Sequence, residues 1–207
     1  MNTLETILQK KIIAIIRLEN YDRALEVAQA LVAGGISVME FTLTGRGATE
    51  AVSRVRAHLG AAACVGVGTV LSVEAAQASI EAGAQFIVTP AVRVPVIAEC
   101  VRQSIPIACG ALTPTELLEA HEAGSELVKL FPAQTFGPKY IKDVLAPFPF
   151  LKLVPTGGVS PENAREYLAA GAVAVGIGGN LVSKSAVSSG NFAAITAAAQ
   201  ACVQAVG

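Results

Sequence analysis

The sequence is poor in charged and aromatic residues and has no tryptophan. Only 15% of its 207 residues are charged, 5% are aromatic, and the formal net charge is −1. Nucleic-acid binding depends on clustered lysine and arginine, and no basic patch occurs here. No apolar run approaches the roughly 20 residues that a membrane-spanning helix needs. We therefore expect neither a nucleic-acid nor a membrane partner.

Cysteine is scarce, and no two cysteines are spaced as a CxxC pair. Such thiols are typical of small buried side chains in a reducing compartment. The segment Met1–Glu5 contains an acid and is not followed by the apolar core and cleavage site of a secretory signal. We expect a cytoplasmic protein whose four cysteines are buried: Cys64, Cys100, Cys109 and Cys202.

Histidine is scarcer still, with two residues, which bears on metal binding. His58 and His121 both fall on expected helices among charged neighbours, where we expect them to be solvated. A divalent metal site would require histidines or clustered carboxylates at the strand ends as ligands. The pairs Gly66-x-Gly68 and Gly176-x-Gly178 do not complete the spacing of a dinucleotide-binding loop. We expect no metal and no cofactor.

Short apolar runs alternate with amphipathic stretches along the whole chain. Such runs indicate buried parallel strands, and the stretches between them indicate helices. The expected strands are residues 12–17, 37–42, 64–69, 85–89, 105–109, 127–131, 151–156 and 173–177. The expected helices between them are residues 22–33, 48–58, 73–82, 95–102, 114–123, 138–145 and 161–170.

Eight strand–helix units without a linker predict a single α/β domain over residues 1–207. The architecture that fits this number and spacing is a parallel eight-stranded (β/α)₈ TIM barrel. An open doubly wound sheet is the competing arrangement. We expect an N-terminal helix at residues 3–10 to close the bottom of the barrel, and a last helix at residues 192–206 to pack on its outside.

Lys129 lies inside the apolar run from Glu126 to Pro132. Burial penalises the ammonium form of a lysine, so its position suggests that a neutral amine is used as a nucleophile toward a carbonyl. The alternative is a lysine that extends from the strand end to solvent.

Glu40 is the only one of the 16 acids inside an apolar strand run. Together with Lys129 it would supply the carboxylate and amine needed for carbinolamine formation and proton transfer. A buried salt bridge with Arg17 or Lys129 is the alternative.

Other polar residues gather where the expected strands end, which is the active-site face of such a barrel. Arg17, Thr42, Thr69 and Thr156 end four different strands, whereas Lys152 begins one and should be structural or solvated.

Glycine pairs follow the last two expected strands. Glycines let backbone N–H groups approach an anion, and barrels commonly bind phosphate at this place. We expect a short helix starting near 179–180 to add its positive end. The expected phosphate-binding residues are Gly157, Gly158, Gly178, Gly179 and Asn180.

Five segments together resemble the 2-keto-3-deoxy-6-phosphogluconate (KDPG) and 4-hydroxy-2-oxoglutarate (KHG) aldolase family, over nearly the whole length. They are residues 35–42 (GISVMEFT), 65–70 (VGVGTV), 82–90 (AGAQFIVTP, ending at Pro90), 129–133 (KLFPA, containing Phe131) and 155–159 (PTGGV).

The resemblance implies a metal-free class I aldolase, usually a homotrimer, that cleaves a phosphorylated keto sugar acid to pyruvate and glyceraldehyde 3-phosphate. On this basis Lys129 forms the Schiff base and Glu40 moves protons. The expected substrate contacts are Arg17, Thr42, Thr69, Pro90, Phe131 and Thr156. The chain departs from the usual pattern of the family at Thr44, Gln134 and Asn180, where arginine, glutamate and serine are frequent.

Three other functions stay open at the level of the sequence. One is cleavage of 2-keto-3-deoxy-6-phosphogalactonate, because residues 136–142 also resemble that branch of the family. Another is a phosphosugar isomerase or epimerase that uses Glu40 as its base. The third is a non-catalytic sugar-phosphate sensor. A decarboxylase side activity on oxaloacetate would use the same enamine.

Overall fold

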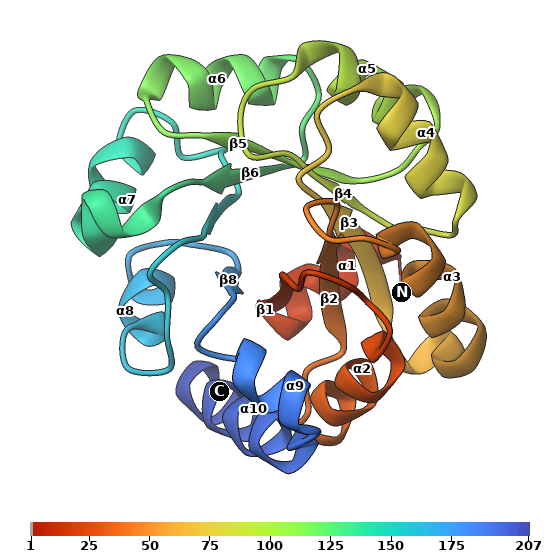
Figure 1. Ribbon diagram of the computed structural model, residues 1–207. Helices are drawn as coiled ribbons and strands as arrows, with labels where there is room; N and C mark the ends of the chain where they lie inside the picture. The colour runs from red at the N-terminus through yellow and green to blue at the C-terminus, as the bar shows by residue number, and fades with distance from the viewer. Residues whose placement is uncertain (1) are drawn as a thin grey trace.

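The computed structural model describes residues 2–207 and contains, within that range, one parallel sheet of eight strands (Figure 1). The strands are hydrogen-bonded in the order β7-β6-β5-β4-β3-β2-β1-β8. Their bounds are β1 Ile12–Ile16, β2 Val38–Thr42, β3 Cys64–Gly68, β4 Ile87–Val88, β5 Ile107–Ala111, β6 Leu127–Leu130, β7 Leu153–Pro155 and β8 Val175–Ile177.

The sheet closes between its first and last members. β1 pairs with β8 in parallel, and a single parallel bridge joins Thr156, just after β7, to Gly176 in β8. Backbone pairing therefore continues around the ring in Figure 1. The expected barrel is confirmed, and the open doubly wound sheet is excluded.

Helices surround the ring, as the alternation in the sequence predicts (Figure 1). The α-helices are α1 Thr3–Lys10, α2 Ala24–Ala33, α3 Ala48–Leu59, α4 Val73–Glu81, α5 Val94–Arg102, α6 Pro114–Glu122, α7 Gly137–Leu145, α8 Ala164–Ala169, α9 Lys184–Ser189 and α10 Phe192–Val206. The short 3₁₀ segments are Gly60–Ala62 and Ala133–Thr135.

Local sequence explains where several helices begin. The Thr113 hydroxyl accepts from the Glu116 backbone N–H, and the Glu116 carboxylate accepts from the Thr113 N–H in return, with Pro114 at the first helical position of α6. This capping box satisfies N–H groups that the first turn cannot pair internally.

Two apolar layers form the core. The larger layer lies between the strands and the surrounding helices. The smaller one fills the barrel interior and includes Ile7 from α1 together with Ile13, Val38, Phe86 and Leu127. Because Ile7 is completely buried there, α1 closes the bottom of the barrel as expected.

Four local expectations were wrong. β5 lies two residues later than predicted, and β4 is only two residues long, because the backbone pairing of the neighbouring strands sets those limits. No helix starts at 179–180. Leu181 and Val182 instead donate to the Gly178 carbonyl in a turn, and α9 begins at Lys184. His121 is half-buried and its ring lies 4.9 Å from that of Phe150, whereas His58 is exposed as expected.

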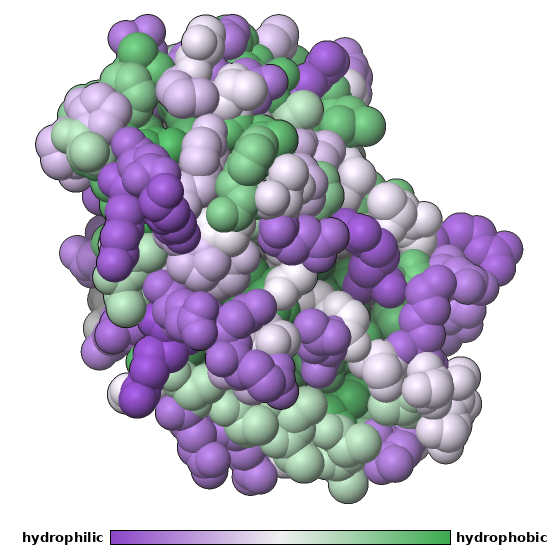
Figure 2. Space-filling model, turned by 90° about the vertical axis from the view of Figure 1, so that its left-hand side faces the viewer, coloured by the Kyte–Doolittle hydropathy of each residue, from purple (hydrophilic) through white to green (hydrophobic). Residues whose placement is uncertain are grey.

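The surface is mixed in character. The face seen in Figure 2 alternates hydrophilic and hydrophobic residues, and neither kind covers it. Within residues 2–207, no helix is both long and apolar enough to span a bilayer. All four cysteines are buried and free, as the sequence predicts. Large apolar side chains that are nonetheless exposed are Leu71, Val94, Val101, Phe136 and Phe150.

Candidate active site

The site is built on one layer of inward-facing residues. Side chains alternate across a strand, so positions two residues beyond the apolar interior layer also point into the barrel. The strand register aligns Glu40 with Ile15 and Gly66, and Lys129 with Gly110 and Val154. Two oppositely charged residues that are distant in the sequence thus share the barrel interior.

Lys129 is held in the interior and does not extend to solvent. Its relative exposure is 4%, which rules out the alternative of a side chain that reaches bulk water. The Nζ atom lies 5.2 Å from the centroid of the Phe131 ring, two positions further along the chain. A cation over an aromatic face is attracted by the ring quadrupole, so Phe131 helps to orient the amine.

Glu40 is as deeply buried, with 2% of its surface exposed. Its Oε1 atom has no hydrogen-bond partner among the described residues. Burial raises the pKa of this carboxyl, and the positive charges of Lys129 and then Arg17 partly oppose the shift. A buried carboxyl with a raised pKa and a free oxygen is suited to exchange protons with a bound substrate.

The Glu40–Lys129 pair is not a closed salt bridge. Within the described residues neither side chain takes part in an ion pair at 4.0 Å or less. The two charges therefore interact through space, and each keeps hydrogen-bonding capacity for another molecule.

Glycines make the room that the polar residues occupy. A methyl group on Gly68 would coincide with the Glu40 carboxylate, and one on Gly176 would collide with the Thr156 hydroxyl oxygen. A methyl group on Gly110 would collide with the Pro90 carbonyl carbon. The absence of side chains in this layer thus keeps space for Glu40, Thr156 and the segment after β4.

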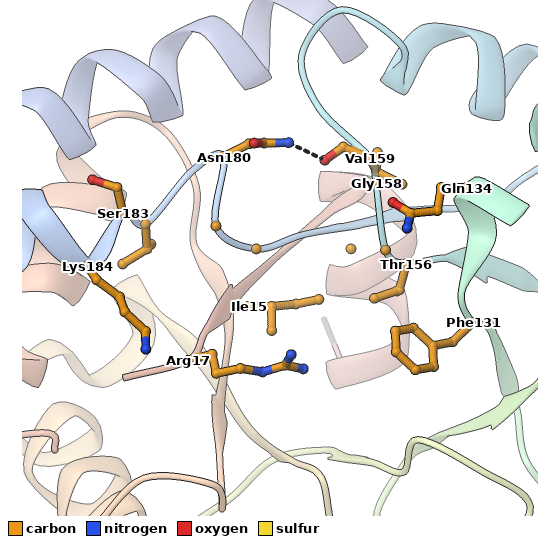
Figure 3. Close-up of a pocket in the computed structure, with 15 residues that line it drawn as sticks. Ile15, Arg17, Phe131, Gln134, Thr156, Gly158, Val159, Asn180, Ser183 and Lys184 are labelled. Atoms are coloured by element: carbon orange, nitrogen blue, oxygen red, sulfur yellow. Dashed lines mark hydrogen bonds between the residues drawn. The ribbon is translucent and has the colours of Figure 1, made fainter. Parts of the chain in front are cut away.

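A pocket of about 590 Å³ opens above this layer (Figure 3). Thr156 and Phe131 line it, and they connect it to the layer of Lys129, although Lys129 and Glu40 themselves are not lining residues. The other lining residues are Ile15, Arg17, Gln134, Gly157, Gly158, Val159, Gly176, Gly178, Gly179, Asn180, Val182, Ser183 and Lys184.

The glycine turns present backbone donors to this pocket. Gly157 and Gly158 have φ angles of +92° and +77°, a conformation that favours glycine. The Ala133 and Gln134 N–H groups donate to Thr156 and Gly157 carbonyls and fix the first turn. The N–H groups of Gly158 and Gly179 donate to no acceptor in residues 2–207. Free N–H groups around a cavity suit an anion.

Tyr21, which sequence reasoning missed, ties two strands of the site together. Its hydroxyl donates toward the carbonyls of Ile16 and Thr42, at 2.9 and 2.8 Å, and accepts from the Thr42 N–H at 3.1 Å. Burial raises the pKa of this phenol. The ends of β1 and β2, next to Arg17 and Glu40, are therefore held by one side chain.

The remaining expected substrate contacts lie around the pocket without lining it. Thr69 follows β3 with a φ of +61°, which is uncommon for a residue with a side chain. The Thr42 hydroxyl is within hydrogen-bond distance of Thr44 and Tyr21. Pro90 is half-buried beside Gly110. Thr69, Thr42 and Pro90 keep their predicted roles as hypotheses.

Several lining residues carried little signal in the sequence. Lys184 and Ser183 follow the second glycine turn closely enough to have been suspected, but they sit in an ordinary polar segment. Asn180 lines the pocket, and its side chain donates to the Val159 carbonyl at 3.4 Å (Figure 3). Within the described chain, no three His, Cys, Asp or Glu side chains are grouped as metal ligands would be.

Comparison with known proteins identifies the family. Residues 4–198 match the family model for KDPG and KHG aldolases. The chain is 37% identical to the 2-dehydro-3-deoxy-phosphogluconate aldolase of Treponema pallidum, covering 98% of this chain and 97% of the relative. It is 34% identical to the 2-dehydro-3-deoxy-6-phosphogalactonate aldolase of Escherichia coli, and this match covers 82% of this chain and 83% of the relative.

A solved structure is similarly close in shape. The KDPG aldolase of Legionella pneumophila, with pyruvate captured as a covalent carbinolamine, superimposes with a TM-score of 0.90 at 29% identity. The match covers 98% of both chains.

Proposed function

The chain belongs to the KDPG and KHG aldolase family, and from this premise we propose that it cleaves a 2-keto-3-deoxy-6-phospho sugar acid to pyruvate and glyceraldehyde 3-phosphate. It is a carbon–carbon lyase of the class I type, which works through a Schiff base. The observation that carries the proposal is the burial of one amine and one carboxylate, Lys129 and Glu40, in the same barrel interior.

The proposed reaction begins at Lys129. Its neutral amine attacks the C2 carbonyl carbon of the substrate to give a carbinolamine, which loses water to form an iminium ion. The iminium ion then accepts the electron pair of the C3–C4 bond as that bond breaks. The C4 hydroxyl loses its proton, and the aldehyde product departs.

Glu40 is proposed to carry the protons in this sequence. Its carboxylate accepts the proton of the C4 hydroxyl during cleavage and returns one to C3 of the enamine, which regenerates the iminium ion of pyruvate. Water then hydrolyses this ion and frees Lys129. The free Oε1 atom and the raised pKa of Glu40 support this role.

The pocket is proposed to hold the other end of the substrate. Thr156 and Phe131 would flank the pyruvyl part, with Thr42, Thr69 and Pro90 near it. Backbone N–H groups of Gly157, Gly158, Gly178 and Gly179, with Asn180 and Arg17, would contact the phosphate. The unpaired N–H groups of the glycine turns support this placement.

The experiment that tests the proposal is reductive trapping. The protein is treated with pyruvate and borohydride, and the modified peptide is mapped by mass spectrometry. We expect one irreversible adduct on Lys129 and loss of turnover in Lys129→Arg, because a guanidinium cannot act as the amine nucleophile. Lys152→Arg, on the exposed start of the β7 segment, serves as the control. An adduct on Lys139 or Lys152, or none, would contradict the assignment.

A second substrate, 2-keto-3-deoxy-6-phosphogalactonate, is supported by the relative from Escherichia coli. The two sugar acids differ in stereochemistry, so kcat/KM measured for each in parallel decides between them. An isomerase would turn over without trapping at Lys129, and a sensor would bind without turnover. 4-Hydroxy-2-oxoglutarate, which would be cleaved to pyruvate and glyoxylate, is the unphosphorylated substrate for which kcat/KM is measured in the same series.

We also propose that the protein is a cytoplasmic homotrimer. The motive for the trimer is the family resemblance, with the exposed Leu71, Val94 and Phe136 as surface that an interface would cover. The motive for the compartment is the four buried free thiols. Light scattering that gives a monomer would contradict the trimer.

A further inference from the structure

The charged residues that line the pocket are all cationic. Among its described lining residues, Arg17 and Lys184 are cationic and none is an aspartate or glutamate. Arg17 enters from the end of β1, whereas Lys184 enters from the start of α9 (Figure 3). The pocket thus combines free backbone donors with two cations, which favours a multiply charged anion.

Lys184 is anchored at its backbone, and its side chain is exposed to solvent. The Ser183 hydroxyl accepts from the Ala186 N–H at 3.2 Å and caps α9, which fixes the position of the Lys184 Cα. The side chain itself is 67% exposed. In Figure 3 it extends from the rim toward the strand that carries Arg17.

The tip of Lys184 has one ionic partner. Its Nζ atom lies 3.2 Å from Oε1 of Glu19, whose side chain is 85% exposed. Exposed ion pairs of this kind contribute little, because water and salt screen them and both side chains lose freedom. Glu19 is therefore a weak partner that a dianion can replace.

We propose that Lys184 is a specificity-determining residue that exchanges Glu19 for the phosphate group of the substrate. The inference rests on the proposed function and adds one residue to it. Glu19 and the phosphate compete for the same ammonium group, so Glu19 lowers the affinity for phosphorylated substrates. An unphosphorylated substrate has no anionic group next to Lys184, so the Lys184–Glu19 ion pair does not affect its affinity.

Steady-state kinetics with two substrates tests this inference. Lys184→Ala raises KM for the phosphorylated sugar acid about five- to tenfold, as expected for one partly solvated charge-assisted contact. KM for 4-hydroxy-2-oxoglutarate and both kcat values stay within about twofold of the wild type. Lys152→Ala is the matched control, because Lys152 is also exposed but lies outside the pocket.

Glu19→Gln provides the second arm of the test. It lowers KM for the phosphorylated substrate about two- to threefold when Lys184 is present and has no effect in the Lys184→Ala background. This double-mutant cycle separates competition for Lys184 from a general change in surface charge. Equal effects of Glu19→Gln in both backgrounds would overturn the inference.

Binding of inorganic phosphate gives a readout that does not depend on turnover. Calorimetry should show phosphate binding to the wild type and about five- to tenfold weaker binding to Lys184→Ala. The factor is the one expected for KM, because the same charge-assisted contact is lost. No phosphate binding, or equal binding by both proteins, overturns the role of Lys184. Failure of the proposed function is recognised separately, because it would abolish pyruvate trapping at Lys129 in the wild type.

Discussion

The carboxylate of Glu40 occupies the space that a side chain at Gly68 would need. An added Cβ atom would overlap Oε1 of Glu40. The two residues lie on neighbouring strands, since Glu40 pairs with Gly66 and Thr42 with Gly68 in the β2–β3 register. Gly68 is thus part of the site although it has no functional group.

Gly68→Ala should therefore impair catalysis by displacing Glu40. We expect kcat to fall at least about 10²-fold, because misplacement of a catalytic group by an ångström has an effect of this size. Gly66→Ala is the comparison, since its methyl group would meet the Phe86 ring instead. Both variants should melt at a lower temperature. A loss of kcat in Gly66→Ala as large as in Gly68→Ala would show that crowding alone is responsible.

Glu40→Gln should reduce kcat about 10²–10⁴-fold, the usual contribution of general acid–base catalysis. The amide keeps the size of the side chain but cannot carry the proton. KM should change much less than kcat, which steady-state kinetics on the phosphorylated substrate measures directly. A variant with normal kcat and raised KM would indicate that Glu40 only binds substrate.

The raised pKa of Glu40 predicts a pH-dependent stability once Lys129 is removed. In Lys129→Met, burial still raises this pKa, while the larger opposing charge is gone. A carboxyl whose pKa is raised in the folded state contributes stability that is complete below its unfolded pKa. That contribution is lost as the pH rises through the folded value.

Adding Glu40→Gln to Lys129→Met should remove this loss. At about pH 4 the double variant and the single variant Lys129→Met should have the same Tm. At about pH 8 the Tm of the double variant should be higher by about 3 °C or more. Differential scanning calorimetry at both pH values measures the difference. If the Tm difference between the two variants were the same at both pH values, Glu40 would not titrate with a raised pKa.

Tyr21→Phe should loosen the ends of β1 and β2. It removes the hydroxyl that donates toward the buried carbonyls of Ile16 and Thr42 and accepts from the Thr42 N–H, at a cost of about 1–3 kcal/mol, or a fall in Tm of several degrees, roughly 2–4 °C for each kcal/mol. Because Arg17 directly follows β1 and Glu40 lies on β2, kcat/KM should fall as well. Tyr140→Phe is the control, since its hydroxyl donates to Leu112, outside the pocket. Unchanged kcat/KM in Tyr21→Phe would limit Tyr21 to a structural role.

Short-range patterns in the sequence were sufficient for the architecture. Alternating apolar runs and helical stretches predicted all eight strands and the barrel, because each element is set by the spacing of its own apolar residues. Lys129 and Glu40 stood out for the same reason, since a charge inside an apolar run is costly. The glycine turns were visible as dipeptides after strands.

The tertiary structure decided the exact limits of the strands and helices and the contacts between them. Backbone pairing moved β5 and shortened β4, and a turn delayed α9 until Lys184. The fit of Glu40 against Gly68, the hydroxyl of Tyr21 across two strands and the ion pair of Lys184 with Glu19 are contacts between different elements. A local pattern cannot encode them, because barrel closure alone brings those residues together. The sequence determined the fold and the two charged residues buried inside it, Lys129 and Glu40, and the closed barrel determined their surroundings.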